Sequence, residues 1–178
     1  RTDYDLSKHQ EHSGRPIEYF DEATKEKFIP HVVEPSAGCD RTVLALLCEA
    51  FEEEEVTDAK GKAEVRTVMR LHPRMAPIKA AIFPLLKKNE EQVRISREIQ
   101  HSLERFMNVF YDQTGAVGRR YRRQDEVGTP FCITVDFETL GEENPELKDT
   151  VTLRHRDSME QERIAISDLL PRLLDEIQ

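Results

Sequence analysis

The spacing of hydrophobic residues predicts a strand, a tight turn and a helix near the start of the chain. Residues 27–33 are rich in β-prone side chains, and the turn after them contains Pro35 and Gly38. Apolar residues then recur at i, i+3, i+4, i+7 and i+8, namely Val43, Leu46, Leu47, Ala50 and Phe51. This period is typical of one face of a helix, so we expect a buried helix entered near Asp40.

The segments around this helix have weaker patterns. Tyr4 and Leu6 alternate with acidic neighbours as in a strand edge, and residues 17–20 favour a second strand. The acidic run 52–55 favours solvent. Residues 64–71 alternate between polar and apolar, which predicts one more strand. These strands, with 27–33, suggest part of an antiparallel sheet.

Beyond the proline-containing segment 72–77, the pattern changes to alternating strands and helices. Strands are predicted at 78–86, 108–111 and 131–137, helices at 90–105, 116–126 and 169–177, and a hairpin at 150–156 and 160–166. A β-α-β-α-β order needs crossover connections, so we expect a largely parallel sheet with the hairpin at an edge.

Composition narrows the classes of protein. The 178 residues are 38% hydrophobic and 34% charged, with no apolar run long enough to span a bilayer and no signal-peptide pattern. Three widely spaced cysteines fit a reducing compartment, so we expect a soluble, cytoplasmic protein with no membrane partner. His9 and His12 lack a second ligand pair, and we predict no metal site. The chain opens without Met, which suggests a piece of a longer polypeptide.

The turn Glu34-Pro-Ser-Ala-Gly-Cys-Asp-Arg41 is the first candidate site. Free backbone N–H groups and the positive end of the helix dipole favour phosphate there. The forked guanidinium of Arg41 adds bidentate phosphate binding, and Glu34 with Ser36 suits an ammonium and a small polar group. The alternative to a phosphate site is an ordinary turn, in which Arg41 only pairs with a neighbouring group.

A second candidate is the arginine cluster Arg119, Arg120, Arg122 and Arg123 on the helix 116–126. Arginines beside an aromatic residue suit the phosphates and unstacked bases of a nucleic acid. Alternatively, residues 124–126 (Gln-Asp-Glu) pair with the arginines as a solvated face. The net charge of −9 argues against indiscriminate nucleic-acid binding, but it leaves room for a local basic surface. On the hairpin, Arg154 is expected opposite Glu162 and Arg156 opposite Glu160.

Residues 34–41 before a helix resemble motif 3 of class II aminoacyl-tRNA synthetases, in the form that glycyl-tRNA synthetases use. Residues 1–6, 71–79, 118–131 and 135–137 look like the same family's C-terminal half. The resemblance implies an α+β fragment of the class II antiparallel catalytic domain at 1–75. It also implies an α/β anticodon-binding domain at 76–178, with a mixed, largely parallel sheet and flanking helices.

The chemistry implied by the resemblance is ATP-dependent activation of glycine and its transfer to glycine tRNA. Arg41 would be catalytic, on the ATP γ-phosphate, and Gly38, Cys39 and Asp40 would line the nucleotide. Glycine would lie against Glu34, Pro35, Ser36, Ala37 and Gly38, with the Glu34 carboxylate on its ammonium. Mg²⁺ would arrive with ATP, on ligands that mostly lie upstream.

One departure from the family pattern is that motifs 1 and 2 are not in this sequence. Motif 1 is the usual dimer element and motif 2 carries half of the ATP site. We therefore expect a homodimeric enzyme as the parent protein and an isolated chain that is inactive. The alternative is a non-catalytic accessory module that holds RNA or DNA on the same scaffold.

Overall fold

The computed structural model describes residues 2–57, 61, 63–142 and 144–177. The chain divides into two compact units, one that ends at Thr42 and one that begins at Val43. This division reflects compactness, and the predicted domain boundary between residues 75 and 76 stays a prediction.

The first unit contains a helix and a two-stranded sheet. Helix α1 (Tyr4–Ser13) ends at Gly14, which has a φ of 64°, and strands β1 (Tyr19–Phe20) and β2 (Lys27–Phe28) pair antiparallel. The strand predicted around residues 3–6 is therefore wrong, because four residues of alternation are too few to outweigh the backbone hydrogen bonds of a helix. The predicted strand 27–33 is limited to its first two residues, since Pro30 has no N–H for a ladder.

Helix α2 (Cys39–Ala50) lies where the sequence predicts it, but its predicted burial is wrong. Among its residues only Ala50 is buried, and the side chains of Val43, Leu44 and Leu47 are exposed. The 3.6-residue period predicts the helix correctly. Burial also needs a second element that packs on the apolar face, and the described residues do not supply one.

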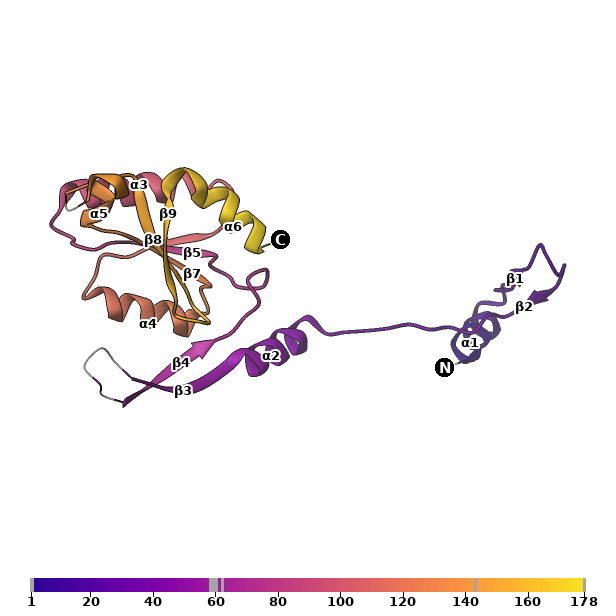
Figure 1. Ribbon diagram of the computed structural model, residues 1–178. Helices are drawn as coiled ribbons and strands as arrows, with labels where there is room; N and C mark the ends of the chain where they lie inside the picture. The colour runs from indigo at the N-terminus through magenta and orange to yellow at the C-terminus, as the bar shows by residue number, and fades with distance from the viewer. Residues whose placement is uncertain (1, 58–60, 62, 143, 178) are drawn as a thin grey trace. The chain divides into compact units, whose positions relative to one another are not determined.

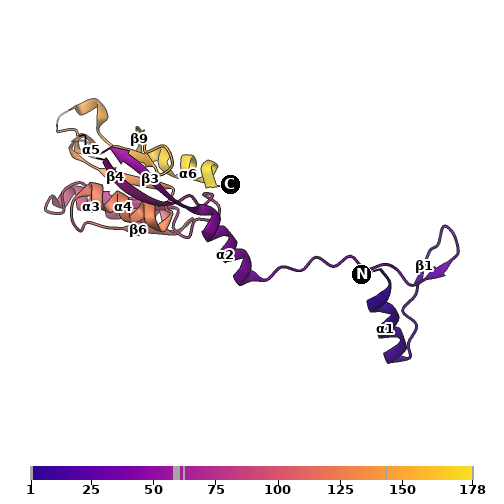
Figure 2. The same ribbon diagram turned by 90° about the horizontal axis from the view of Figure 1, so that it is seen from below.

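The acidic run forms a strand, which the sequence reading missed. Strand β3 (Phe51–Thr57) follows α2 directly and pairs antiparallel with β4 (Ala63–Met69), the strand predicted at 64–71 (Figure 2). In this register Glu54 lies opposite Arg66, and Glu52 lies within reach of Arg70. Cross-strand ion pairs of this kind offset the low strand propensity of glutamate.

A mixed five-stranded sheet has the order β6-β5-β7-β8-β9 (Figure 1). Its strands are β5 (Ala80–Pro84), β6 (Val109–Tyr111), β7 (Phe131–Val135), β8 (Thr150–His155) and β9 (Gln161–Ala165). Strand β5 pairs parallel with β6 and β7, whereas β7–β8 and β8–β9 are antiparallel. The predicted α/β fold and edge hairpin are confirmed, and parallel pairing covers half of the sheet.

Helices cover both faces of this sheet (Figure 1). They are α3 (Glu90–Leu103), α4 (Val117–Val127), α5 (Phe137–Leu140) and α6 (Leu169–Ile177), with single 3₁₀ turns at Pro145–Leu147 and Ile166–Asp168. Ala80 and Ile82 of β5 pack in the core under α3 and α6, whereas Ala81 and Phe83 pack under α4. This alternation is the two-residue period of a strand buried on both faces.

Gly128 should be required by the close approach of β4 to the end of α4. It has a φ of +86°, and an added Cβ would lie 3.0 Å from the Met69 carbonyl oxygen and 3.1 Å from Leu71 Cδ1. We expect Gly128→Ala to lower the free energy of unfolding in urea by about 2–4 kcal/mol, the sum of overpacking and backbone strain. Gly115→Ala is the matched control, since Gly115 has a φ of +79° and open space around its Cα. Equal losses for the two variants would contradict the packing argument.

Candidate functional site

The candidate glycine-binding residues lie in the first unit. Glu34 and Ser36 line a hollow of about 450 Å³ together with Val32 and with Asp5 and His9 of α1. Arg41 is not among the residues that line it. The structure of this chain therefore brings Glu34 and Ser36 together but does not place the Arg41 guanidinium in the same hollow.

The turn that precedes α2 is exposed throughout, at Glu34, Pro35, Ser36, Ala37, Gly38, Cys39, Asp40 and Arg41. The Thr42 N–H and hydroxyl both donate to the Gly38 carbonyl, each at 3.0 Å, which closes the first helical turn. An exposed helix start with a guanidinium on it has the chemistry that a phosphate needs.

The arginine cluster on α4 divides into one buried and three accessible residues. Arg120 is only 2% exposed, and its guanidinium donates to the carbonyl oxygens of Pro84 and Gly115. Burial lowers the pKa of Arg120 from its usual value. Arg120 thus connects α4 to the end of β5 and to the loop after β6. Because its guanidinium is buried, the prediction that it contacts tRNA is corrected for this residue.

Two of the three other arginines have acidic or carbonyl partners at the surface. Arg122 pairs with Glu64 at 2.9 Å, and Arg123 pairs with Asp112 and donates to the Thr114 carbonyl at 2.9 Å. Arg119 is exposed. The predicted pairing of the cluster with residues 124–126 is therefore wrong, because Arg122 and Arg123 pair with Glu64 and Asp112 instead, while Asp125 binds Arg66 and Arg154. The tRNA contact of the accessible arginines stays a prediction.

A buried ionic cluster around Asp125 is the polar feature that the sequence reading missed. The Asp125 side chain is 1% exposed and accepts hydrogen bonds from Arg154 at 2.9 and 3.0 Å and from Arg66 Nε at 2.9 Å. A signal was present, because Asp125 continues the stripe of Val117 and Tyr121 at i+4 spacing, the helix face that meets the sheet. An acid on such a stripe needs a buried cation.

The predicted pairs on the β8–β9 hairpin are wrong by one residue of register. Arg154 lies opposite Gln161, and Leu153 lies opposite Glu162. A shift of one residue puts Arg154 and Glu162 on opposite faces of the sheet, so they cannot pair, and the Arg154 side chain binds Asp125 of α4. Glu162 pairs with His155 at 3.0 Å.

Burial alone would lower the pKa of Arg154, but its hydrogen bonds to Asp125 raise it above the usual value. The Arg154 guanidinium also lies 4.8 Å from the centre of the Tyr121 ring. The cation therefore stays charged inside the domain, held by one carboxylate and one aromatic face.

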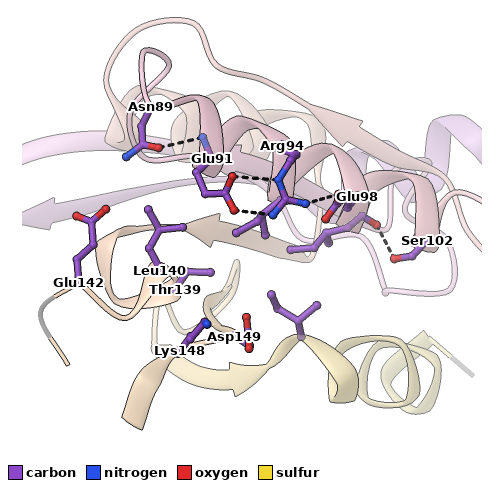
Figure 3. Close-up of a pocket in the computed structure, with 13 residues that line it drawn as sticks. Asn89, Glu91, Arg94, Glu98, Ser102, Thr139, Leu140, Glu142, Lys148 and Asp149 are labelled. Atoms are coloured by element: carbon purple, nitrogen blue, oxygen red, sulfur yellow. Dashed lines mark hydrogen bonds and ion pairs between the residues drawn. The ribbon is translucent and has the colours of Figure 1, made fainter. Parts of the chain in front are cut away.

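A cleft of about 720 Å³ lies between α3 and α5 (Figure 3). Arg94 bridges Glu91 and Glu98 on the α3 wall, and Lys148 and Asp149 stand on the opposite wall. Acidic residues outnumber basic ones here, and the Arg94 guanidinium is already paired. The cleft therefore does not favour a phosphate.

Within the described residues, no group of three or more His, Cys, Asp or Glu side chains is placed to hold a metal ion. Over the same residues, none of the helices has the length and apolar character that crossing a membrane requires.

A family model for the "Anticodon binding domain" matches residues 79–176. The chain belongs to the anticodon-binding domain family. Its relatives named glycine–tRNA ligase include proteins of Clostridium perfringens, 56% identical over 95% of this chain, and Thermobifida fusca, 54% identical over 95%. That of Clostridium tetani is 48% identical over 100%. The chain spans about a third of each relative's length, at 34%, 35% and 36%.

These findings confirm the resemblance to glycyl-tRNA synthetases, which are aminoacyl-tRNA synthetases. They also confirm that an anticodon-binding domain makes up the second half of the chain. The names carry no information on individual residues, so the assignments at 34–41 and on α4 stay predictions.

Asp136 organises the end of β7 in the anticodon-binding domain. Its carboxylate accepts from the Thr139 N–H at 3.0 Å, from the Thr152 hydroxyl at 3.0 Å and from Arg163. Burial alone would raise the pKa of Asp136, but the bonds from Arg163 and Thr139 hold it below the usual value. The charged form is thus part of the folded state.

Folding stability should therefore fall at acidic pH. Because the pKa of Asp136 is lower when folded than when unfolded, its contribution is complete above the unfolded value and is lost as pH falls through the folded one. We expect Asp136→Asn to cost about 1–3 kcal/mol at pH 7 and to flatten the decline in unfolding free energy between about pH 5 and pH 2. Urea denaturation across pH measures this. Asp175→Asn, at an exposed position on α6, is the control, and an unchanged slope in Asp136→Asn would contradict the assignment.

Proposed function

We propose that the chain is the tRNA-binding part of a glycine–tRNA ligase, with residues 79–176 contacting the anticodon region of glycine tRNA. The family match over these residues carries the proposal. The similarity to proteins named glycine–tRNA ligase across 95% of the chain supports glycine tRNA as the partner.

The tRNA contact is proposed for Arg119, Arg122 and Arg123 on the outer face of α4. Each is at least partly exposed, and the partners Glu64 and Asp112 are side chains that a phosphate can displace. An exchange of one anion for another costs little, whereas a guanidinium held by buried carbonyls, such as Arg120, is not available.

Replacing these three arginines should weaken tRNA binding. We expect Arg119→Ala, Arg122→Ala and Arg123→Ala together to raise the Kd for glycine tRNA at least tenfold in fluorescence anisotropy. The slope of log K against log salt should fall by about two to three, because each lost phosphate contact releases fewer counterions. The control removes the same charge elsewhere, with Arg94→Ala, Arg105→Ala and Arg172→Ala at exposed positions on or after other helices. Equal weakening in both triples would make the effect one of net charge.

We further propose that residues 34–41 supply motif 3 of the ligase, with Arg41 on the ATP γ-phosphate and Glu34 on the glycine ammonium. The exposed helix start and the Arg41 guanidinium fit a phosphate, and the hollow of Glu34 and Ser36 fits a small amino acid. Gly38, Cys39 and Asp40 would add the backbone lining. ATP, Mg²⁺ and a homodimeric parent belong to this proposal, and the remaining ATP ligands would come from other segments of the ligase.

The role of Arg41 is tested in the full-length ligase that contains this chain. We expect Arg41→Ala to reduce glycine-dependent ATP–pyrophosphate exchange by at least 100-fold, as for loss of a cation that stabilises developing charge. Arg15→Ala, at another exposed arginine of the first unit, is the control. Near-normal exchange in Arg41→Ala would remove Arg41 from the mechanism. A wild-type parent that binds tRNA without exchange would favour the non-catalytic accessory module instead.

A further inference from the structure

The hairpin β3–β4 lies outside the residues that match the anticodon-binding family, which begin at residue 79. It nevertheless lies against α4 of that domain (Figure 1), and its buried side chains include Arg66 and Val68. Val68 is 0% exposed, and Gly128 lets the Met69 carbonyl approach the end of α4. The hairpin and the domain are therefore one packed body.

Arg66 fixes this contact through directional hydrogen bonds as well as through burial of its side chain. Its guanidinium is 1% exposed, donates to Asp125 of α4 at 2.9 Å, and also binds Glu54 of β3 and the Arg156 carbonyl. The bonds to Asp125 and to the Arg156 carbonyl each restrict movement of the hairpin across the domain, whereas the bond to Glu54 lies within the hairpin and orients the guanidinium. A purely apolar contact would allow small shifts that this forked group does not.

Arg70 makes a second, more accessible attachment. It binds Glu52 and Glu54 of β3 and reaches Asp157, in the turn between β8 and β9, at 3.2 Å. Its side chain is 26% exposed, so the attachment is a part of the contact that a substitution can remove without opening the core.

The hairpin is in turn continuous with α2. Strand β3 begins at Phe51, immediately after the helix ends at Ala50 (Figure 2). The Arg70 N–H donates to the Ala50 carbonyl at 2.6 Å, and Ala50 packs against Leu71 and Ala76. The carboxyl end of α2 therefore moves with the hairpin.

The geometry points to Arg66 and Arg70 as positioning residues that hold the part of α2 from Val43 to Ala50 in one orientation relative to the tRNA-binding domain. This inference rests on the proposed function, in which α2 carries Arg41 and the domain carries the tRNA. Activation of glycine needs only the site around α2, whereas transfer also needs the tRNA in register with that site. The ionic contact should therefore matter for transfer and not for activation.

The test uses the full-length ligase with Arg70→Ala and, separately, Arg66→Met, which keeps the length of the side chain. Glycine-dependent ATP–pyrophosphate exchange, measured without tRNA, should stay within twofold of wild type. The kcat of glycine tRNA charging should fall at least tenfold, with the KM for tRNA changed less than threefold. Arg94→Ala, which breaks the pairs with Glu91 and Glu98 on α3, should leave both activities unchanged.

Three outcomes would overturn the inference: charging within twofold of wild type in Arg70→Ala, equal losses of exchange and charging, or a rise in KM alone. If the Arg66→Met variant does not fold, the comparison of exchange and charging in Arg70→Ala alone decides the test. A wild-type ligase that charges no glycine tRNA would instead count against the proposed function.

Discussion

The second unit depends on one buried carboxylate, that of Asp125, which accepts hydrogen bonds from Arg66 and Arg154. Each of these ions costs several kcal/mol to remove from water, and the cost is offset only when the whole set of partners is present. Glu54 also accepts a hydrogen bond from the Arg66 guanidinium. Arg156, whose carbonyl accepts from Arg66, binds Asp157 with its own side chain. Helix α4, strand β8 and the hairpin β3–β4 therefore meet in a single arrangement, because any other would leave a charge buried without a partner.

Between residues 80 and 177, local signals were sufficient for the five strands and for α3, α4 and α6, but not for the short helix α5. The helix predicted at 90–105 is confirmed as α3. The Asn89 side chain caps it by accepting from the Glu91 and Gln92 N–H groups at 3.1 Å, and the apolar side chains of α3 meet the sheet. The same kind of reasoning failed at α1 and β3. At α1 the only cue was short-range alternation, and at β3 it was a run of like charges. The actual secondary structure depends on partners elsewhere in the chain, as Glu54 of β3 depends on Arg66.

The candidate site was predictable in part for the same reason. Exposure of Arg119, Arg122 and Arg123 follows from the helical period, but the burial of Arg120 depends on carbonyls of Pro84 and Gly115 that no local pattern reveals. The register of the β8–β9 hairpin was missed by one residue, and that single step exchanges a surface pair for a bond to Asp125. At the turn 34–41, local chemistry suggested a phosphate site, but the roles of ATP and glycine there came only from the resemblance to a known family.

Under the proposed function, the use of arginine would also explain how a chain of net charge −9 binds RNA selectively. Arg66, Arg120, Arg154 and Arg156 are all buried, so their positive charge holds the fold together and adds little to the surface field. The acidic remainder repels polyanions in general, and attraction is left to short accessible stretches such as the outer face of α4. A surface of this kind binds where its few cations match the spacing of phosphates and disfavours contact elsewhere. Selectivity for one RNA then follows from the placement of charge within the protein, and the buried ionic cluster is what fixes that placement.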